Sequence, residues 1–384
     1  MTPSTSSMPN TAVDVTPTSA AIVWRDPARA AAFGQWLAAT SAACHIDPAT
    51  LRLASADASF RRYFRISQSD GSCIIMDAPP AQEDCAPFVK VAELMAQAGL
   101  KAPRVLAWDQ AQGFMLLTDL GSQTMMEVIK QQGSLDIVPQ NGQLIHQLYM
   151  DAVDALIQWQ LSSRPDVLPA YDDALLSREL ALFPDWYIAQ HRGISIDNAL
   201  QEKLAVFFAQ IKASNLHSLG GARVFVHRDF MPRNLMVSSA DAHDASSLGA
   251  NSLGVLDFQD AVYGPITYDI ASLMRDAFLS WDEEFVIDIT IRYWQKARKA
   301  GLPVGDDFGE FYRAVEWMGL QRHLKILGIF ARLTLRDGKP QYLADTPRFI
   351  KYARSTASRY RQLGPLMVLL DEIEGNETRI GYTF

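Results

Sequence analysis

The chain has 384 residues and a formal net charge of −8, with 48% hydrophobic and 20% charged residues. At about 150 residues per domain this length corresponds to two or three domains, and the composition is that of an ordinary folded protein, which excludes collagen-like, coiled-coil and wholly disordered chains. The acidic balance provides no general field for nucleic acid or for an anionic membrane surface, so an anionic ligand must be held by local basic groups.

Cysteine content and the N-terminal sequence bear on location. The three cysteines are too few for a disulfide framework and lack the CxxC spacing of a zinc site; they are Cys44, Cys73 and Cys85. Residues 1–22 are rich in Ser, Thr and Pro and lack the basic and apolar regions of a signal peptide, and no run of about 18 uncharged apolar residues occurs in the chain. We therefore expect a cytoplasmic protein without a membrane span, whose residues 1–22 form a disordered tail.

The first part of the chain after the tail predicts a small mixed lobe at 23–120. Asp26 and Pro27 have the sequence of a helix start, as N-cap and first helical residue, for a helix that runs to about residue 43. Two strands, a helix and two further strands follow, at 60–66, 73–76, 86–98, 105–108 and 114–117. The Asp-Gly pair at 70–71 marks a tight turn, so the first two strands form a hairpin.

The second part, 121–384, predicts a larger and mainly helical lobe. Five segments suit helices by their apolar spacing, at 144–161, 178–190, 197–214, 282–300 and 309–336, and the cap residues Thr346-Pro347 begin a further helix. One compact β patch is expected between them, built from residues 224–226, 235–237 and 254–256, with a loop at 238–252. The fold class predicted from these elements is α+β.

One segment carries the pattern of a phosphoryl-transfer site. It reads His227-Arg228-Asp229, four residues, Asn234 and a strand, and Asp257 follows at the end of the next strand. Phosphoryl transfer needs a carboxylate that accepts the proton of the nucleophile, and hard oxygen ligands for Mg²⁺. Asp229 fits the first role, and Asn234 and Asp257 fit the second. These residues also favour plain turns, but the joint pattern favours the catalytic interpretation.

The segment resembles the catalytic loop and metal motif of the aminoglycoside phosphotransferase family, the small-molecule relatives of protein kinases. The strings HRDFMPRNLMV, LDFQDAVYGPITYDIASLMRDAF, DASFRRYFR, IIMDAPP and QRHLKILGIFARL resemble more narrowly the bacterial anomeric kinases that phosphorylate N-acetylmuramate and N-acetylglucosamine during peptidoglycan recycling. The resemblance implies a bilobal protein-kinase-like fold, ATP and Mg²⁺ as cofactors, and a sugar 1-phosphate as product. It implies that Asp229 is the catalytic base in a His227-Arg228-Asp229 motif, and that residues Thr118 to Leu120 form the interlobe hinge that meets adenine.

The sequence departs from the kinase pattern in the small lobe. Kinases carry a lysine on the third strand that holds the nucleotide phosphates, but the corresponding strand here ends in Met76-Asp77. A carboxylate beside a triphosphate needs an intervening cation, so we expect Asp77 to anchor an arginine. The candidates that replace the lysine are Arg61, Arg62 and Arg65, with Glu93 as an orienting residue; the alternative is that all three arginines are solvated.

The length of the hairpin turn decides which arginine faces Asp77. A three-residue turn at 69–71 places Tyr63 opposite Asp77, with Arg61 and Arg65 as diagonal neighbours, whereas a two-residue turn selects Arg62. The glycine-rich loop of kinases is also missing, and we expect a turn around Ser59 to cover the phosphates with its backbone N–H groups.

Residues after the metal motif are candidates for binding the substrate. Tyr268-Asp269 is expected either to cap a helix or to brace the catalytic loop through His227 or Arg228. Asp260 is a candidate for the sugar hydroxyls, although a plain turn residue explains it equally well. The lactyl carboxylate of N-acetylmuramate needs a local cation, for which the candidates are Arg275, Arg322 and Lys325; the alternative for these is ordinary surface charge.

The predicted function is therefore ATP-dependent phosphorylation of an amino sugar, with no nucleic acid, membrane or obligate protein partner. Other kinases of the same fold, acting on choline, ethanolamine, homoserine or aminoglycosides, are alternatives. A pseudokinase that serves as a binding module is a further alternative, because the lysine and the glycines are missing.

Overall fold

The computed structural model describes residues 22–24, 26–56, 60–132, 142–238 and 252–375. The predicted tail at 1–22 therefore lies almost wholly outside the described residues. The chain divides into two compact units, a smaller one of Met1–Cys85 with Val105–Asp119 and a larger one of Ala86–Arg104 with Leu120–Phe384. The helix at 86–98, which we expected in the smaller lobe, groups with the larger unit.

The smaller unit is a five-stranded antiparallel sheet with one helix packed on it. The strand order is β1-β2-β3-β5-β4, and the strands are β1 Ile46–Ala56, β2 Arg62–Gln68, β3 Gly71–Asp77, β4 Val105–Asp109 and β5 Phe114–Thr118. Helix α1, Pro27–Cys44, begins as predicted, because the Asp26 carboxylate accepts a hydrogen bond from the Ala28 N–H. Phe33 and Leu37 of α1 are buried against Phe64, Ile75 and other apolar residues of the sheet.

The register of the β2–β3 hairpin places Arg62 opposite Asp77. Gln68 pairs with Gly71, so the turn has two residues, and the ladder continues to the Arg62–Asp77 pair. Because side chains alternate between the faces of a strand, Arg62 shares the α1 face with Phe64 of the core, whereas Tyr63 and Arg65 lie on the opposite face. The hairpin follows the two-residue alternative of the sequence analysis.

The larger unit is mainly helical. Its helices are α2 Ala86–Gln97, α3 Met125–Gln131, α4 Gly142–Leu161, α5 Asp173–Leu182, α6 Asn198–His217, α7 Thr267–Met274, α8 Glu283–Lys299, α9 Phe308–Leu335, α10 Thr346–Arg359 and α11 Gly364–Glu374. The segment predicted as one helix at 178–190 changes character within it: α5 ends at Leu182 and a π-helix, Phe183–His191, follows.

The predicted single β patch is wrong in its pairing. Strand β7, Arg223–Val226, pairs with β10, Val262–Pro265, while β8, Leu235–Val237, lies between β6, Gln123–Thr124, and β9, Gly254–Val255. The loop between β7 and β8 therefore joins two small sheets. The sequence analysis did not predict β10, which carries Gly264 and Pro265 and pairs with β7. The β8–β9 pairing, Leu235 with Val255, agrees with the prediction.

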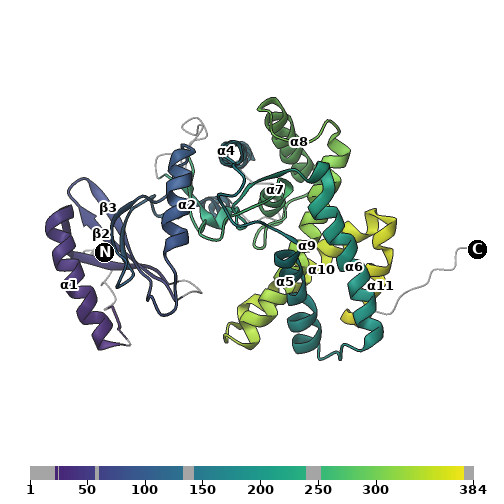
Figure 1. The fold of residues 1–384 in the computed structure, drawn as a ribbon, viewed down its shortest axis with the longest axis horizontal. Coiled ribbons are helices and arrows are strands. Elements are labelled where there is room, and N and C mark those ends of the chain that lie inside the picture. Colours follow the sequence, from purple (N-terminus) through teal and green to yellow (C-terminus); the bar gives the residue numbers. More distant parts are fainter. Residues whose placement is uncertain (1–21, 25, 57–59, 133–141, 239–251, 376–384) are drawn as a thin grey trace, which may run out of the picture. The chain divides into compact units, whose positions relative to one another are not determined.

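Helix α9 is the central helix of the larger unit, where it packs against α5, α6, α7 and α10 (Figure 1). Gly328 permits the close approach of α9 to the end of α5, because a Cβ at this position would lie 2.2 Å from the Leu182 carbonyl oxygen. The approach fixes α5 relative to α9, and both helices contribute buried charged residues near the β7–β8 loop. None of the described helices combines the length and the apolar character that a membrane span requires.

Candidate active site

The loop from His227 to Asn234 joins β7 to β8 and carries the predicted catalytic motif; we call it the catalytic loop. A 3-10 turn, Pro232–Asn234, ends it. The Asn234 side-chain amide donates to the Asp229 carbonyl oxygen at 2.8 Å and lies 3.4 Å from an Asp257 carboxylate oxygen. The Leu256 N–H donates to the Asn234 carbonyl at 2.9 Å. These bonds bring the motif residues together at one end of β8 and β9, as the spacing predicts.

Two non-glycine residues of this site have a left-handed backbone. Arg228 has a φ of +77° and Asp257 a φ of +63°. Such conformations cost about 1–3 kcal/mol for non-glycine residues and persist where surrounding contacts hold them, often at functional sites. Asp257 is exposed and accepts a 2.9 Å hydrogen bond from the Gln259 side chain, whereas Asp229 is half-buried.

Asp269, from α7, holds the start of the catalytic loop. Its carboxylate accepts hydrogen bonds from the backbone N–H groups of His227, at 2.7 Å, and Arg228, at 3.0 Å. The side chain is fully buried, and this burial raises the pKa of Asp269 to about 7 against the opposing effect of the two N–H donors and Arg322. The N-cap position of α7 belongs to Ile266, so of the two predicted roles the structure shows the brace.

His227 lies beneath Asp229 as a neutral imidazole. Burial lowers the pKa of His227 to about 4. Its Nδ1 lies 3.2 Å from the backbone nitrogen of Asp229, and its Nε2 lies 3.0 Å from the Leu256 carbonyl oxygen. With one donor and one acceptor in the neutral ring, Nδ1 accepts from Asp229 and the Nε2 proton is donated to Leu256. His227 thus links the catalytic loop to the residue before Asp257.

Arg228 belongs to a buried charged group centred on Glu179 of α5. One Glu179 oxygen accepts from Arg228 at 2.6 Å and from Lys325 at 2.7 Å. The other accepts from the Tyr171 hydroxyl at 2.7 Å and the Gln321 amide at 2.9 Å. Burial alone would raise the pKa of Glu179, but the pairing with Lys325 and Arg228 outweighs it and lowers that pKa well below its ordinary value. We call these five residues the Glu179 cluster.

Two of the three predicted substrate-binding cations, Arg322 and Lys325, are buried in the larger unit. Arg322 is 3% exposed and donates to the Arg228 carbonyl at 2.7 Å, and Lys325 is 9% exposed within the Glu179 cluster. The surface-charge interpretation of these two residues is therefore wrong, because their observed bonds are to the catalytic loop, to Glu179 and to the Tyr268 hydroxyl. Arg275 pairs with Glu283 at 3.0 Å, whereas Asp260 is exposed and offers its backbone carbonyl to Arg228 at 3.4 Å.

The three arginines proposed to replace the lysine are ion-paired, so the interpretation that they are solvated charges is also wrong. Arg61 pairs with Glu83 at 3.0 Å and Arg65 with Asp119 at 2.5 Å. Arg62 makes two bonds to one Asp77 oxygen, at 2.6 and 3.0 Å, and Arg29 of α1 binds the other oxygen. Asp77 anchors an arginine, as expected, but does so on the α1 face of the sheet.

Thr118 and Leu120, two further residues predicted to serve the nucleotide site, stand on either side of the point in the sequence where the chain passes from the smaller to the larger unit. Thr118 ends β5 in the smaller unit, and Leu120 begins the second segment of the larger unit. The Leu120 side chain lies against β9, where a Cβ on Gly254 would approach it to 2.9 Å. Ser59 lies outside the described residues, and Glu93 is exposed on α2.

Sequence reasoning missed Glu179 and Asp119 as partners of arginines, and Arg29 as the second partner of Asp77. The signal for Glu179 was available: it is a lone acid between Leu176 and Leu180 on the apolar side of a helix, where a charge needs a buried partner. Its charged partners, Arg228 and Lys325, are distant in the sequence, which is why spacing alone did not reveal them.

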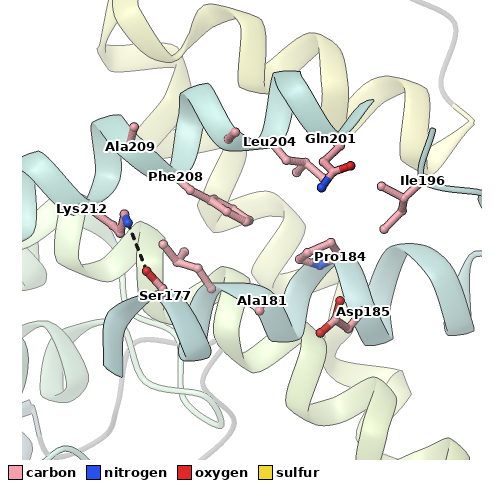
Figure 2. Close-up of a pocket in the computed structure, with 12 residues that line it drawn as sticks. Ser177, Ala181, Pro184, Asp185, Ile196, Gln201, Leu204, Phe208, Ala209 and Lys212 are labelled. Carbon is pink, nitrogen blue, oxygen red and sulfur yellow. Dashed lines mark hydrogen bonds between the residues drawn. The ribbon is translucent and has the colours of Figure 1, made fainter. Parts of the chain in front are cut away.

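A cavity of about 490 Å³ lies between α5, the following π-helix and α6. Figure 2 shows that apolar side chains such as Ala181, Pro184, Leu204 and Phe208 line it. Its Lys212 and Ser177 bond to each other at 3.1 Å. The lining offers few polar groups that converge on a sugar, so we do not assign the acceptor site to it.

Comparison with known proteins defines the class of the chain. The model of the phosphotransferase enzyme family matches residues 50–306, and the chain belongs to this family. In solved structures the fold recurs in a putative aminoglycoside phosphotransferase from Ralstonia eutropha, with a TM-score of 0.58 at 12% identity over 85% of this chain and 96% of that one. It recurs in the Plasmodium vivax ethanolamine kinase, with a TM-score of 0.57 at 10% identity over 87% and 92%. The α+β protein-kinase-like fold is thus confirmed.

Two curated relatives are much more similar in sequence. The N-acetylmuramate/N-acetylglucosamine kinase of Pseudomonas aeruginosa is 49% identical over 325 residues, which cover 85% of this chain and 89% of that protein. The protein of the same name from Neisseria meningitidis is 46% identical over 338 residues, or 87% and 94%. The predicted resemblance is confirmed, and membership in a kinase family implies ATP as the phosphate donor.

Proposed function

We propose that this protein transfers the γ-phosphate of ATP to the anomeric hydroxyl of N-acetylmuramate, N-acetylglucosamine or both, and so forms a sugar 1-phosphate. The observation that carries the proposal is the geometry of the catalytic loop. Hydrogen bonds of Asp269, His227 and Asn234 hold this loop. Its half-buried Asp229 lies beside the pair formed by Asn234 and Asp257. The similarity to two kinases named for these sugars supports the choice of acceptor.

Asp229 is the base in this proposal. The anomeric oxygen attacks the γ-phosphorus, its proton passes to the Asp229 carboxylate, and the bond between the γ-phosphorus and the oxygen retained by ADP breaks. The loop contacts described above fix the backbone of Asp229, so the carboxylate is positioned before the substrates bind.

The residues present fit a Mg²⁺ ion. Asn234 uses its NH₂ group toward the Asp229 carbonyl and Asp257, which leaves the amide oxygen as a hard donor, and Asp257 contributes an exposed carboxylate. Mg²⁺ prefers one or two such protein oxygens together with phosphate oxygens and water. We propose Asn234 and Asp257 as its ligands; when bound, the ion would neutralise charge on the phosphates.

We assign nucleotide contacts to residues of the smaller unit and to Thr118 to Leu120. Arg65 is preferred over Arg62 because it lies on the face of the sheet opposite α1. It is preferred over Arg61 because its side chain is more exposed, at 20% against 9%. Thr118 to Leu120 would meet adenine, and Ser59 would contact the phosphates through its backbone N–H. We further propose that the enzyme acts in the cytoplasm, where ATP is available, in peptidoglycan recycling.

An ADP-release assay with a panel of acceptors tests the proposal. We expect turnover with N-acetylmuramate or N-acetylglucosamine, and no turnover with the 1-O-methyl glycosides of the same sugars, in which the anomeric hydroxyl is blocked. Turnover with choline, ethanolamine, homoserine or an aminoglycoside, in place of the sugars, would overturn the choice of acceptor. Nucleotide binding without turnover of any acceptor would favour the pseudokinase.

A further inference from the structure

The catalytic loop contains two arginines with different surroundings. Arg228 is neutralised by Glu179 at 2.6 Å. Arg233 lies in the Pro232–Asn234 turn, next to Asn234, and is half-buried. Its guanidinium lies 4.8 Å from the centre of the Phe278 ring. Within the part of the chain that the structure describes, Arg233 forms no ion pair and donates no hydrogen bond.

The other cations considered for substrate binding are committed to internal partners. Arg275 pairs with Glu283, Lys325 with Glu179, and Arg322 donates to the Arg228 carbonyl. Arg233 is therefore the cation of the catalytic loop whose charge the described residues do not balance. In a chain with a net charge of −8, such a charge beside the catalytic residues is a ready site for an anion.

The two sugars of the proposed function differ in one anionic group. N-acetylmuramate carries a lactyl ether that ends in a carboxylate, and N-acetylglucosamine has a hydroxyl at the same carbon. A guanidinium presents N–H donors in a planar fork that matches a carboxylate. The contact with the Phe278 ring is a cation–π contact and not a hydrogen bond, so the N–H donors of Arg233 remain for a ligand.

We propose that Arg233 binds the carboxylate of the acceptor and thereby determines the preference for N-acetylmuramate over N-acetylglucosamine. This inference rests on the proposed function, because it needs both sugars to be candidate acceptors. Arg233 is a specificity-determining residue in this scheme, and Phe278 orients it.

The test replaces Arg233 and compares the two acceptors. In Arg233→Gln we expect kcat/KM for N-acetylmuramate to fall by about 10- to 100-fold, mostly through KM, as for a lost charged hydrogen bond. N-acetylglucosamine turnover stays within about twofold, which also shows that the variant is folded. Arg233→Lys restores part of the loss, because it keeps the charge but not the fork.

A matched control is Arg313→Gln. Arg313 also stacks on an aromatic ring, 4.9 Å from the centre of Trp317, and lies nine residues, or about 14 Å of helix, before Arg322 on α9. We expect it to leave kcat/KM for both sugars unchanged. An effect of Arg313→Gln as selective as that of Arg233→Gln would overturn the assignment.

A change on the substrate side completes the cycle. Esterifying the lactyl carboxylate of N-acetylmuramate should cost the wild-type enzyme about as much as the Arg233→Gln change, and should cost the variant little more. Equal losses for both sugars in Arg233→Gln and Arg233→Lys overturn the inference and indicate a role toward the donor phosphates or the fold. If the wild type turns over neither sugar, the proposed function itself fails.

Discussion

The Oδ2 atom of Asp269 lies 2.7 Å from the backbone nitrogen of His227. The second carboxylate oxygen accepts from the next amide, that of Arg228. One buried side chain of α7 thus satisfies two consecutive N–H groups at the point where Arg228 adopts its left-handed backbone. We infer that Asp269 holds the strained start of the loop two residues before the proposed base.

Asp269→Asn should reduce kcat more than it affects binding. An asparagine offers one oxygen, and its NH₂ group would face the other N–H donor, so the loop shifts. We expect kcat to fall by about 10- to 100-fold with little change in KM for ATP or sugar, and the free energy of unfolding to fall by about 2 kcal/mol. Steady-state kinetics and urea denaturation measure these. As a control, Asp307→Asn makes the same substitution at the N-cap of α9. Asparagine caps a helix as well as aspartate does, so neither kcat nor the free energy of unfolding should change. An unchanged kcat in Asp269→Asn would contradict the bracing role.

The Glu179 cluster should respond non-additively to mutation. Glu179→Gln leaves Lys325 and Arg228 buried without a counter-charge, and we expect it to lower the free energy of unfolding by about 3–5 kcal/mol. Lys325→Met alone leaves the negative charge of Glu179 partly balanced by Arg228, so it should lower the free energy of unfolding by less than Glu179→Gln does. The Glu179→Gln/Lys325→Met double variant should be more stable than the sum of the single changes predicts, because it removes one of the two charges that Glu179→Gln leaves unpaired. Strictly additive losses in equilibrium denaturation would show that the pair is not coupled.

Arg65 and Arg62 form a matched pair on opposite faces of β2. Arg65→Gln is expected to raise KM for ATP by about tenfold, the effect of one lost phosphate contact. Arg62→Gln removes a partner of Asp77 on the α1 face, where Arg29 still binds the carboxylate, and should leave KM for ATP within about twofold. The reverse outcome, with ATP binding weakened only in Arg62→Gln, would mean that the face has been assigned wrongly.

His323 of α9 should make stability depend on pH. Burial, with Arg275 and Arg322 nearby, lowers the pKa of His323 from 6.5 to about 3. The unfolded chain binds this proton below pH 6.5, whereas the folded chain does not until about pH 3, so stability falls as the pH drops through that window. His323→Phe, which keeps the stacking on Tyr352, should reduce this loss by on the order of 3 kcal/mol between pH 7 and 4.5. Parallel pH profiles of unfolding for the two proteins would contradict this prediction.

The sequence predicted local elements where a strong local signal exists. The Asp26-Pro27 helix start and the hairpin at 62–77 have such signals in the cap and in the turn. The strand β1 was missed because Pro48 and several alanines weaken its β signal; the structure accommodates it at the edge of the sheet, where a missing N–H is tolerated. The π-helix after Leu182 was missed because its apolar pattern continues that of α5.

The candidate site was predictable where spacing along the chain determines it, as for Asp229, Asn234 and Asp257. The supporting contacts depend on tertiary structure. The sequence analysis interpreted Arg322 and Lys325 as surface charges or ligand contacts. It could not identify their partners, the Arg228 carbonyl and Glu179, because both lie far upstream in the chain. The residue opposite Asp77 likewise depended on whether the hairpin turn between β2 and β3 has two or three residues.

The most direct test of the proposed mechanism is the Asp229→Asn variant, assayed for ADP release with the preferred sugar and for ATP binding by titration. We expect turnover to fall by about 10²- to 10⁴-fold, the usual contribution of a general base, with ATP affinity retained within about twofold. Turnover close to that of the wild type in a folded Asp229→Asn protein would contradict the assignment of Asp229 as the base.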